Sequence, residues 1–93
     1  NGKKYFNEQM ENAEIAKRWF MGSRFDKILA IKTLKSDRNK TLKVLEILLK
    51  ITNQTFAQNP KENALKTKEI LRALDRISKN GNISLILLKM AIA

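Results

Sequence analysis

The sequence predicts an all-α fold, a compact five-helix bundle that forms a single domain over residues 1–93. Apolar residues recur at intervals of three and four, as on one face of a helix, and no segment sustains the alternation typical of strands. Only one Pro and three Gly interrupt the chain. A chain of this length is the size of one domain and buries a modest core.

The first helix is expected over residues 3–21. Gly22 is expected to end it, because glycine reaches the left-handed conformation of a helix C-terminus at little cost. Its core face would consist of Phe6, Met10, Ala13, Ala16 and Phe20, with Trp19 beside it. A second helix follows to about residue 35, with Ser23 as its N-cap and Asp26 as an acid in its first turn. Its inward side chains would be Phe25, Ile28, Leu29 and Leu34.

The third helix, over residues 38–58, is the longest, and Ser36 and Asp37 precede it as capping residues. One apolar stripe comprises Leu42, Leu45, Leu49 and Phe56, and a second comprises Val44, Ile47, Leu48 and Ile51. A helix that is apolar over more than half of its circumference contacts at least two neighbours. We therefore expect this helix at the centre of the bundle.

Asn59-Pro60 interrupts the pattern, because proline disfavours helix at the residue before it. The fourth helix is expected over residues 61–79, with inward side chains Ile70, Leu74 and Ile77. Asp75 and Lys79 are spaced to form an outward ion pair. The helix-capping motif Asn80, Gly81 and Asn82 would end this helix and begin the next one.

The fifth helix, residues 83–93, is apolar at nine of its eleven positions. A surface helix needs only three or four apolar positions in seven. Two interpretations remain: a fully buried central helix, or a helix buried half in its own domain and half against a partner. We prefer the second, because the third helix already occupies the centre. The candidate subunit interface on its outward side consists of Ile83, Ile86, Leu87 and Met90.

Residues for catalysis are scarce. His and Cys are absent, which removes the commonest general base, disulfides and thiolate metal ligands. There is no phosphate-binding glycine loop, and no serine has a histidine to activate it. Glu8, Glu11 and Glu14 could gather on one helix face, but a solvated stripe is the preferred interpretation. We expect a domain that is not an enzyme, with no cofactor, no metal and no small-molecule substrate.

The formal charge of +10, from 19 basic and 9 acidic residues, makes nucleic acid a partner to consider, although ordinary solvated faces are the preferred interpretation of this charge. Arg38, Lys40 and Lys43 could lead the recognition helix of a helix-turn-helix. The third helix is, however, too long and too apolar to lie in a groove with one face free. Trp19 and Phe20 could stack on bases, but they sit at core spacing. Weak DNA contact therefore stays open, whereas no apolar run is long enough to predict a membrane span.

The order of elements resembles a known family. The last two helices read Leu71-Arg72-Ala73-Leu74, then Ile77, Asn80-Gly81-Asn82, Leu85, Leu87 and Leu88, and upstream stands SDRNKTLKVLEILLKITNQT. With Ala13, Ala16 and the break at Gly22, this pattern is similar to the C-terminal collar domain of bacterial DNA polymerase III clamp-loader subunits. The delta-prime subunits match most closely, and the tau/gamma and delta subunits have collars of the same general kind.

The resemblance implies an oligomerisation domain at the C-terminus of a longer AAA+-type subunit, and the absence of an initial Met fits such a fragment. Its partners would be other clamp-loader subunits in a cytoplasmic pentameric ring that loads sliding clamps on DNA during replication. The family's ATPase modules, arginine finger and zinc site precede the collar and have no counterparts here. Two alternatives remain: a basic helical nucleic-acid-binding domain, and a homodimeric helical adaptor.

Overall fold

In a computed structural model that describes residues 2–93, the chain is an all-α bundle, as predicted. The described residues form α1 (Gly2–Met21), α2 (Arg24–Leu34), α3 (Arg38–Gln54), the 3-10 turn η1 (Phe56–Gln58), α4 (Pro60–Ser78) and α5 (Ile83–Ile92). No strand occurs among them. The largest difference from the predicted boundaries is in the third helix, which ends at Gln54 and continues as the 3-10 turn.

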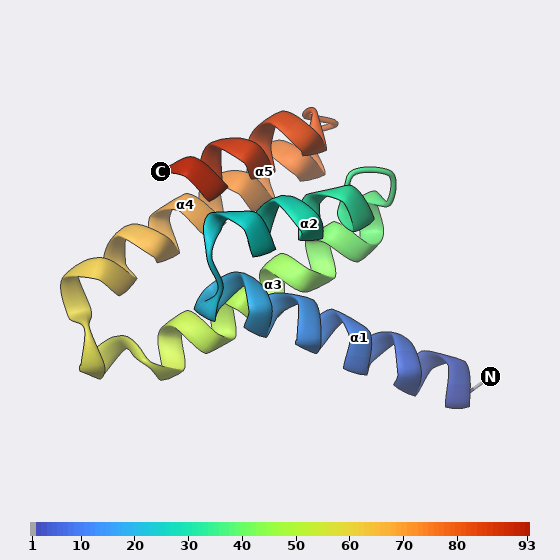
Figure 1. The fold of residues 1–93 in the computed structure, drawn as a ribbon, viewed down its shortest axis with the longest axis horizontal. Coiled ribbons are helices and arrows are strands. Elements are labelled where there is room, and N and C mark those ends of the chain that lie inside the picture. The colour runs from blue at the N-terminus through green and yellow to red at the C-terminus, as the bar shows by residue number, and fades with distance from the viewer. Residues whose placement is uncertain (1) are drawn as a thin grey trace.

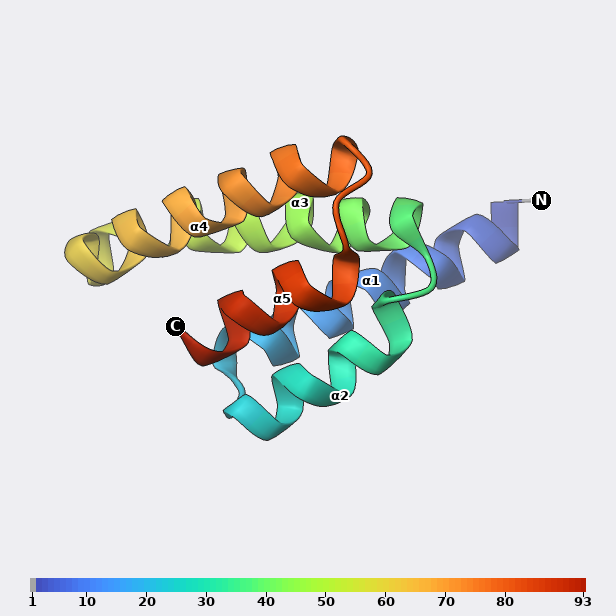
Figure 2. The ribbon, with the colours of Figure 1, turned by 90° about the horizontal axis from the view of Figure 1, so that it is seen from above.

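Helix α3 lies at the centre, as predicted, but with 17 residues it is shorter than α1 and α4 and is not the longest helix. It packs against α1 on one side and α4 on the other, and the N-terminal part of α1 extends past the bundle (Figure 1). Helices α2 and α5 pack side by side in opposite directions, and α5 also packs against α4 (Figure 2). The last helix therefore packs mainly against two neighbours, and it leaves Leu85, Leu88 and Ile92 exposed.

All five helices contribute to one hydrophobic core. Its buried members are Ala16 and Trp19 of α1, Ile31 and Leu34 of α2, Val44, Leu45 and Leu48 of α3, Ile70, Ala73 and Ile77 of α4, and Ile83, Leu87 and Ala91 of α5. Full burial of a Leu, Ile or Val side chain contributes about 1.5–3 kcal/mol to folding. Of the three side chains of α4 that were predicted to face inward, Ile70 and Ile77 are buried in the core and Leu74 is half-buried beside it.

The predicted inward faces of the first two helices are wrong in part. The side chains that the structure leaves exposed are Phe6, Met10, Phe25, Ile28 and Leu29. Phe6 is 60% exposed and Phe25 is 67% exposed, whereas the polar Asn12 lies on the buried face of α1. Both helices carry apolar residues on two faces, and in each helix tertiary packing covers only one of these faces. Phe56, predicted on the core stripe of α3, lies in η1 and is exposed.

Local sequence signals end and begin the helices. The Ser23 side chain accepts a hydrogen bond from the Asp26 amide, and Asp26 Oδ2 accepts one from the Ser23 amide at 3.0 Å, which is a capping box. Asp37 Oδ1 accepts from the Lys40 amide at 3.0 Å. These predicted caps are confirmed. Gly22 does not have the expected positive φ. Glycine is needed there because a Cβ atom would collide with the Arg18 carbonyl oxygen.

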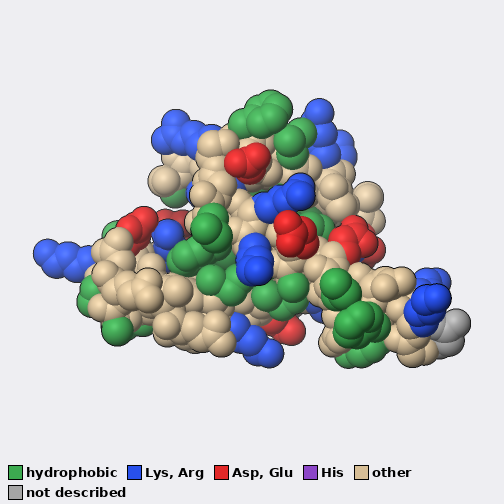
Figure 3. All heavy atoms as spheres, turned by 60° about the horizontal axis from the view of Figure 1, so that its bottom comes forward, with side chains coloured by type: hydrophobic (Ala, Val, Ile, Leu, Met, Phe, Trp, Pro, Cys, Tyr) green, Lys and Arg blue, Asp and Glu red, His purple; other side chains and the backbone are tan. Residues whose placement is uncertain are grey.

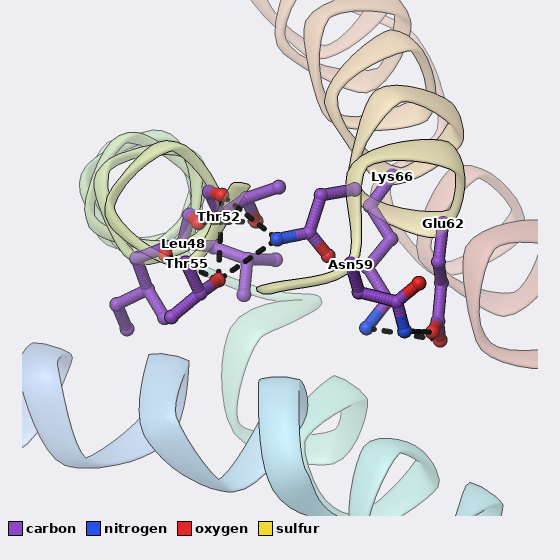
Figure 4. Close-up of polar contacts among 8 residues, drawn as sticks. Leu48, Thr52, Thr55, Asn59, Glu62 and Lys66 are labelled. Atoms are coloured by element: carbon purple, nitrogen blue, oxygen red, sulfur yellow. Dashed lines mark hydrogen bonds and ion pairs between the residues drawn. The ribbon is translucent and has the colours of Figure 1, made fainter. Parts of the chain in front are cut away.

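A buried amide joins the end of α3 to the start of α4. Asn63 Nδ2 donates to the Thr52 carbonyl at 3.0 Å and to Thr55 Oγ1 at 2.9 Å. Figure 4 shows these bonds crossing between the two helices, and it also shows the ion pair of Glu62 with Lys66. A buried polar group must be paired to avoid a large desolvation cost. Asn63 therefore fixes the sharp reversal around η1.

A single arginine ties the α2–α3 turn to the α4–α5 turn. Arg38, the first residue of α3, donates from Nη1 to the Ile77 carbonyl and, at 3.2 Å, to the Gly81 carbonyl. The last carbonyls of a helix have no partner within it, and a cation there also interacts favourably with the helix dipole. Arg38 therefore stabilises the C-terminal end of α4 while it anchors the start of α3.

We expect Arg38→Ala to lower the free energy of unfolding by about 1.5–3 kcal/mol, because two carbonyls lose a charged donor. Urea unfolding followed by circular dichroism measures this change. Lys68→Ala is the matched control, since Lys68 is an exposed cation of α4, and its effect should stay within about 0.5 kcal/mol. Equal effects of the two substitutions would contradict the role of Arg38.

Candidate subunit interface

The predicted capping motif at residues 80–82 does connect α4 to α5. Asn80 has φ 66°, in the left-handed region. The Asn80 amide donates to the Ile77 carbonyl at 3.2 Å and the Gly81 amide donates to the Arg76 carbonyl at 2.8 Å, which is a Schellman motif. Asn82 Oδ1 then accepts from the Leu85 amide at 2.9 Å and caps α5. One short turn therefore sets the direction in which α5 leaves α4.

Gly81 serves this turn through its size, since Asn80 is the residue with the left-handed backbone. A Cβ atom at Gly81 would lie 2.6 Å from the Arg76 carbonyl oxygen and 2.7 Å from Ile86 Cδ1. Both distances are shorter than van der Waals contact allows. The absence of a side chain at Gly81 therefore lets the start of α5 approach the end of α4.

The inward face of α5 consists of residues spaced four apart. Ile83, Leu87 and Ala91 are buried, and Ile86 and Met90 are half-buried beside the core. The prediction that Ile83 and Leu87 face outward is wrong, because these side chains are only 7% and 1% exposed. A helix with apolar residues all round gives no sequence signal for which of its faces packs against its neighbours.

The outward side of α5 is apolar as well. Its exposed residues Leu85, Leu88 and Ile92 lie on a helix that packs beside α2, which exposes Phe25, Ile28 and Leu29. We call these six residues the α2–α5 surface. Large exposed apolar patches on soluble proteins typically mark sites of interaction. The sequence predicts an outward apolar face on the last helix, but Leu85, Leu88 and Ile92 were not among the residues that we expected in it.

A second exposed apolar group lies on α1. It consists of Tyr5, Phe6 and Met10, which we call the α1 patch. Figure 3 shows hydrophobic side chains gathered at this end of the molecule. Helix α1 carries this patch on its N-terminal half, which extends past the bundle (Figure 1). The α1 patch and the α2–α5 surface therefore belong to different elements.

The three glutamates of α1 are side chains of its surface. Glu11 Oε1 lies 3.2 Å from Lys40 Nζ, and Glu14 Oε1 lies 3.3 Å from Arg18 Nε, while Glu8 lines a hollow with Lys43. Within residues 2–93, no three Asp, Glu, His or Cys side chains come together as a metal-binding group. None of the helices in that range has the length and apolar character needed to cross a membrane.

The cations at the start of α3 are largely engaged within the domain. Arg38 bonds to carbonyls of the α4–α5 turn, and Lys40, with a side chain 11% exposed, pairs with Glu11. Of the three residues considered for a recognition helix, only Lys43 is exposed. Trp19 is buried in the core, as its spacing predicted. These residues therefore do not form an open surface for reading bases.

We expect Gly81→Ala to destabilise the domain by about 1–3 kcal/mol, because the added methyl group overlaps atoms of both helices. Gly2→Ala is the control, since a Cβ atom at Gly2 meets nothing within 4 Å. Thermal unfolding of the two variants measures the difference. A Gly81→Ala variant as stable as Gly2→Ala would rule out the close approach of α4 and α5.

We also expect Leu87→Asp and Leu88→Asp to differ sharply. Leu87→Asp places a charge in the core and should cost more than about 3 kcal/mol. Leu88 is 40% exposed, so Leu88→Asp should cost about 1 kcal/mol. Chemical denaturation of both variants tests the rotation of α5 about its axis. A greater loss of stability at Leu88 would show that the helix has a different face inward.

Comparison of the chain with models of protein families, with curated proteins and with solved structures gives no match. What the chain does is therefore inferred from its own residues.

Proposed function

We propose that this chain is the collar domain of a bacterial DNA polymerase III clamp-loader subunit, most like delta-prime. In this proposal it catalyses nothing itself and holds the subunits of a cytoplasmic clamp loader together during DNA replication. The observation that carries the proposal is the α2–α5 surface, where two adjacent helices expose six large apolar side chains. The order of helices and the Asn80-Gly81-Asn82 turn support it through the family resemblance.

Burial of the α2–α5 surface against a neighbour would be favourable. Phe25 and Leu85 are 67% and 58% exposed, and covering the exposed half of such a side chain contributes about 1 kcal/mol. Permanent interfaces between subunits are more apolar than the rest of a protein surface. The character of this surface therefore fits a stable assembly better than a transient encounter.

The two apolar groups favour a ring over a symmetric dimer. In a ring, each subunit uses one surface toward one neighbour and a different surface toward the other. The α2–α5 surface and the α1 patch lie on different elements and could serve as such a pair. A homodimeric adaptor with two-fold symmetry needs only one patch, so the α1 patch would have no purpose in it.

Nucleic-acid binding is the weaker candidate. The net charge of +10 attracts polyanions, but Arg38 and Lys40 bond within the domain and Trp19 is buried. Contacts made only with phosphates would weaken steeply as salt is raised. We therefore expect any contact with DNA to be secondary to assembly.

Assembly can be tested by mixing the chain with purified clamp-loader subunits at roughly 0.3 M salt, which suppresses long-range electrostatics. Size exclusion with light scattering should show a defined complex. The double variant Phe25→Asp/Leu88→Asp should lose it, because both side chains lie on the α2–α5 surface. Lys43→Ala, at an exposed position of α3, should leave it unchanged.

Three outcomes contradict the proposal. If the chain forms a dimer with itself and binds no clamp-loader subunit, the adaptor alternative holds. If it stays monomeric but binds DNA at the same salt, nucleic-acid binding holds. If Lys43→Ala weakens assembly as much as the double variant does, with both variants folded, the α2–α5 surface is not the interface.

A further inference from the structure

Helices α4 and α5 leave a groove between them, which shares only Leu85 with the α2–α5 surface. Two adjoining hollows, of about 410 and 190 Å³, lie along it. Arg76 of α4 and Ile86 and Lys89 of α5 line both hollows, so the two form one continuous depression. We call it the α4–α5 groove.

The floor of this groove is aliphatic. Ala73 is buried, and Ile86 and Met90 are half-buried, and all three line the hollow nearer the C-terminal end of α5. Methionine adapts its shape to different neighbours, which suits a surface that receives an apolar side chain. An occupant would therefore gain free energy by placing apolar groups in the groove.

The walls of the groove are cationic. Arg72 and Arg76 come from α4 and Lys89 comes from α5, and none of the three forms an ion pair with any residue of the described range 2–93. The groove also contains two carboxylates. Asp75 is paired with Lys79 at 3.1 Å, and Glu69 lies at the end of the groove near Ala93. A surplus of positive charge is left along its middle.

We propose that the α4–α5 groove binds a short, acidic, amphipathic helix of a partner protein. Its apolar side chains would lie over Ile86 and Met90, and its carboxylates would pair with Arg72 and Arg76 on one side and Lys89 on the other. Arginine suits this role because its planar guanidinium binds a carboxylate through two parallel hydrogen bonds. The ten residues of α5 span about 15 Å, which matches about three turns of a docked helix.

An acidic peptide fits the groove better than a nucleic acid does. No aromatic ring lines either hollow, so bases would find no stacking platform. The aliphatic floor needs an apolar partner group, which a nucleic-acid backbone does not supply. This inference does not depend on the proposed clamp-loader function.

The test uses a fluorescein-labelled peptide of 16 residues built from Glu, Ala and Leu, with Leu at helical spacing and Glu on its flanks. Fluorescence anisotropy should show saturable binding to the chain. The double variant Arg72→Glu/Arg76→Glu should weaken binding by about 30-fold or more, since each charge-assisted bond is strong. Lys61→Glu/Lys68→Glu makes the same change in net charge at exposed positions of α4 outside the groove. It should weaken binding by no more than about 3-fold.

Further controls separate the groove from simple charge attraction. A peptide with Ser in place of Leu should bind at least about 10-fold more weakly, because it has nothing to place over Ile86 and Met90. Circular dichroism confirms that each variant is folded, and Lys89→Glu replaces the double variant if that one does not fold.

Several results would overturn the proposal. One is that the Ser peptide binds as tightly as the Leu peptide. Another is that Arg72→Glu/Arg76→Glu and Lys61→Glu/Lys68→Glu weaken binding equally. A third is that the Leu peptide shows no saturable binding below about 1 mM. A 16-nucleotide oligothymidine that binds as tightly as the Leu peptide and competes for the same arginines would assign the groove to nucleic acid. The assembly variant Phe25→Asp/Leu88→Asp lies outside the groove, so failure of one proposal leaves the other standing.

Discussion

The bonds from Arg38 to the α4–α5 turn are the constraint on which the arrangement of the last three helices depends. They fix the start of α3 against the end of α4, and the Asn80-Gly81-Asn82 turn then sets how α5 leaves α4. The rotation of α5 follows from this geometry. Ile83 and Leu87 enter the core, and Leu85 and Leu88 remain outside it. The bonds of Arg38 thus help to determine which side chains of α5 are exposed on the α2–α5 surface, which we propose for assembly.

The polar and apolar parts of the structure have different roles. Apolar burial supplies the stability of the bundle, as in most small domains. The buried amide of Asn63 and the guanidinium of Arg38 decide which arrangement of helices is formed, because each bonds to carbonyls that only the correct packing places within reach. An apolar helix such as α5 could pack in several rotations with similar burial. A few polar contacts near its start select one of them.

The sequence was sufficient to predict what depends on local interactions. Capping and periodicity involve residues only a few positions apart. We therefore predicted correctly the all-α class, the order of the helices and the central position of α3. The predicted caps at Ser23, Asp37 and Asn82 were also correct. Which face of a helix points into the core was harder to predict, because it depends on contacts between helices. Phe6 and Phe25 have core spacing but are exposed, and the buried face of α1 includes the polar Asn12. Ile83 and Leu87 were assigned outward because α5 is apolar all round. Contacts such as Arg38 with Ile77 leave no pattern that a single sequence reveals.

The separation of contacts along the chain also has a consequence for the order of folding. Asn63 joins α4 to Thr52, only 11 residues away, so the α3–α4 hairpin closes a short loop at little entropic cost. The bond of Arg38 to Ile77 spans 39 residues, and it can form only after both helices exist and have docked. Contacts absent from the folding transition state govern how fast a native protein opens. In this chain, we therefore expect the Asn63 junction to form early in folding and the Arg38 link to act mainly on the rate of unfolding.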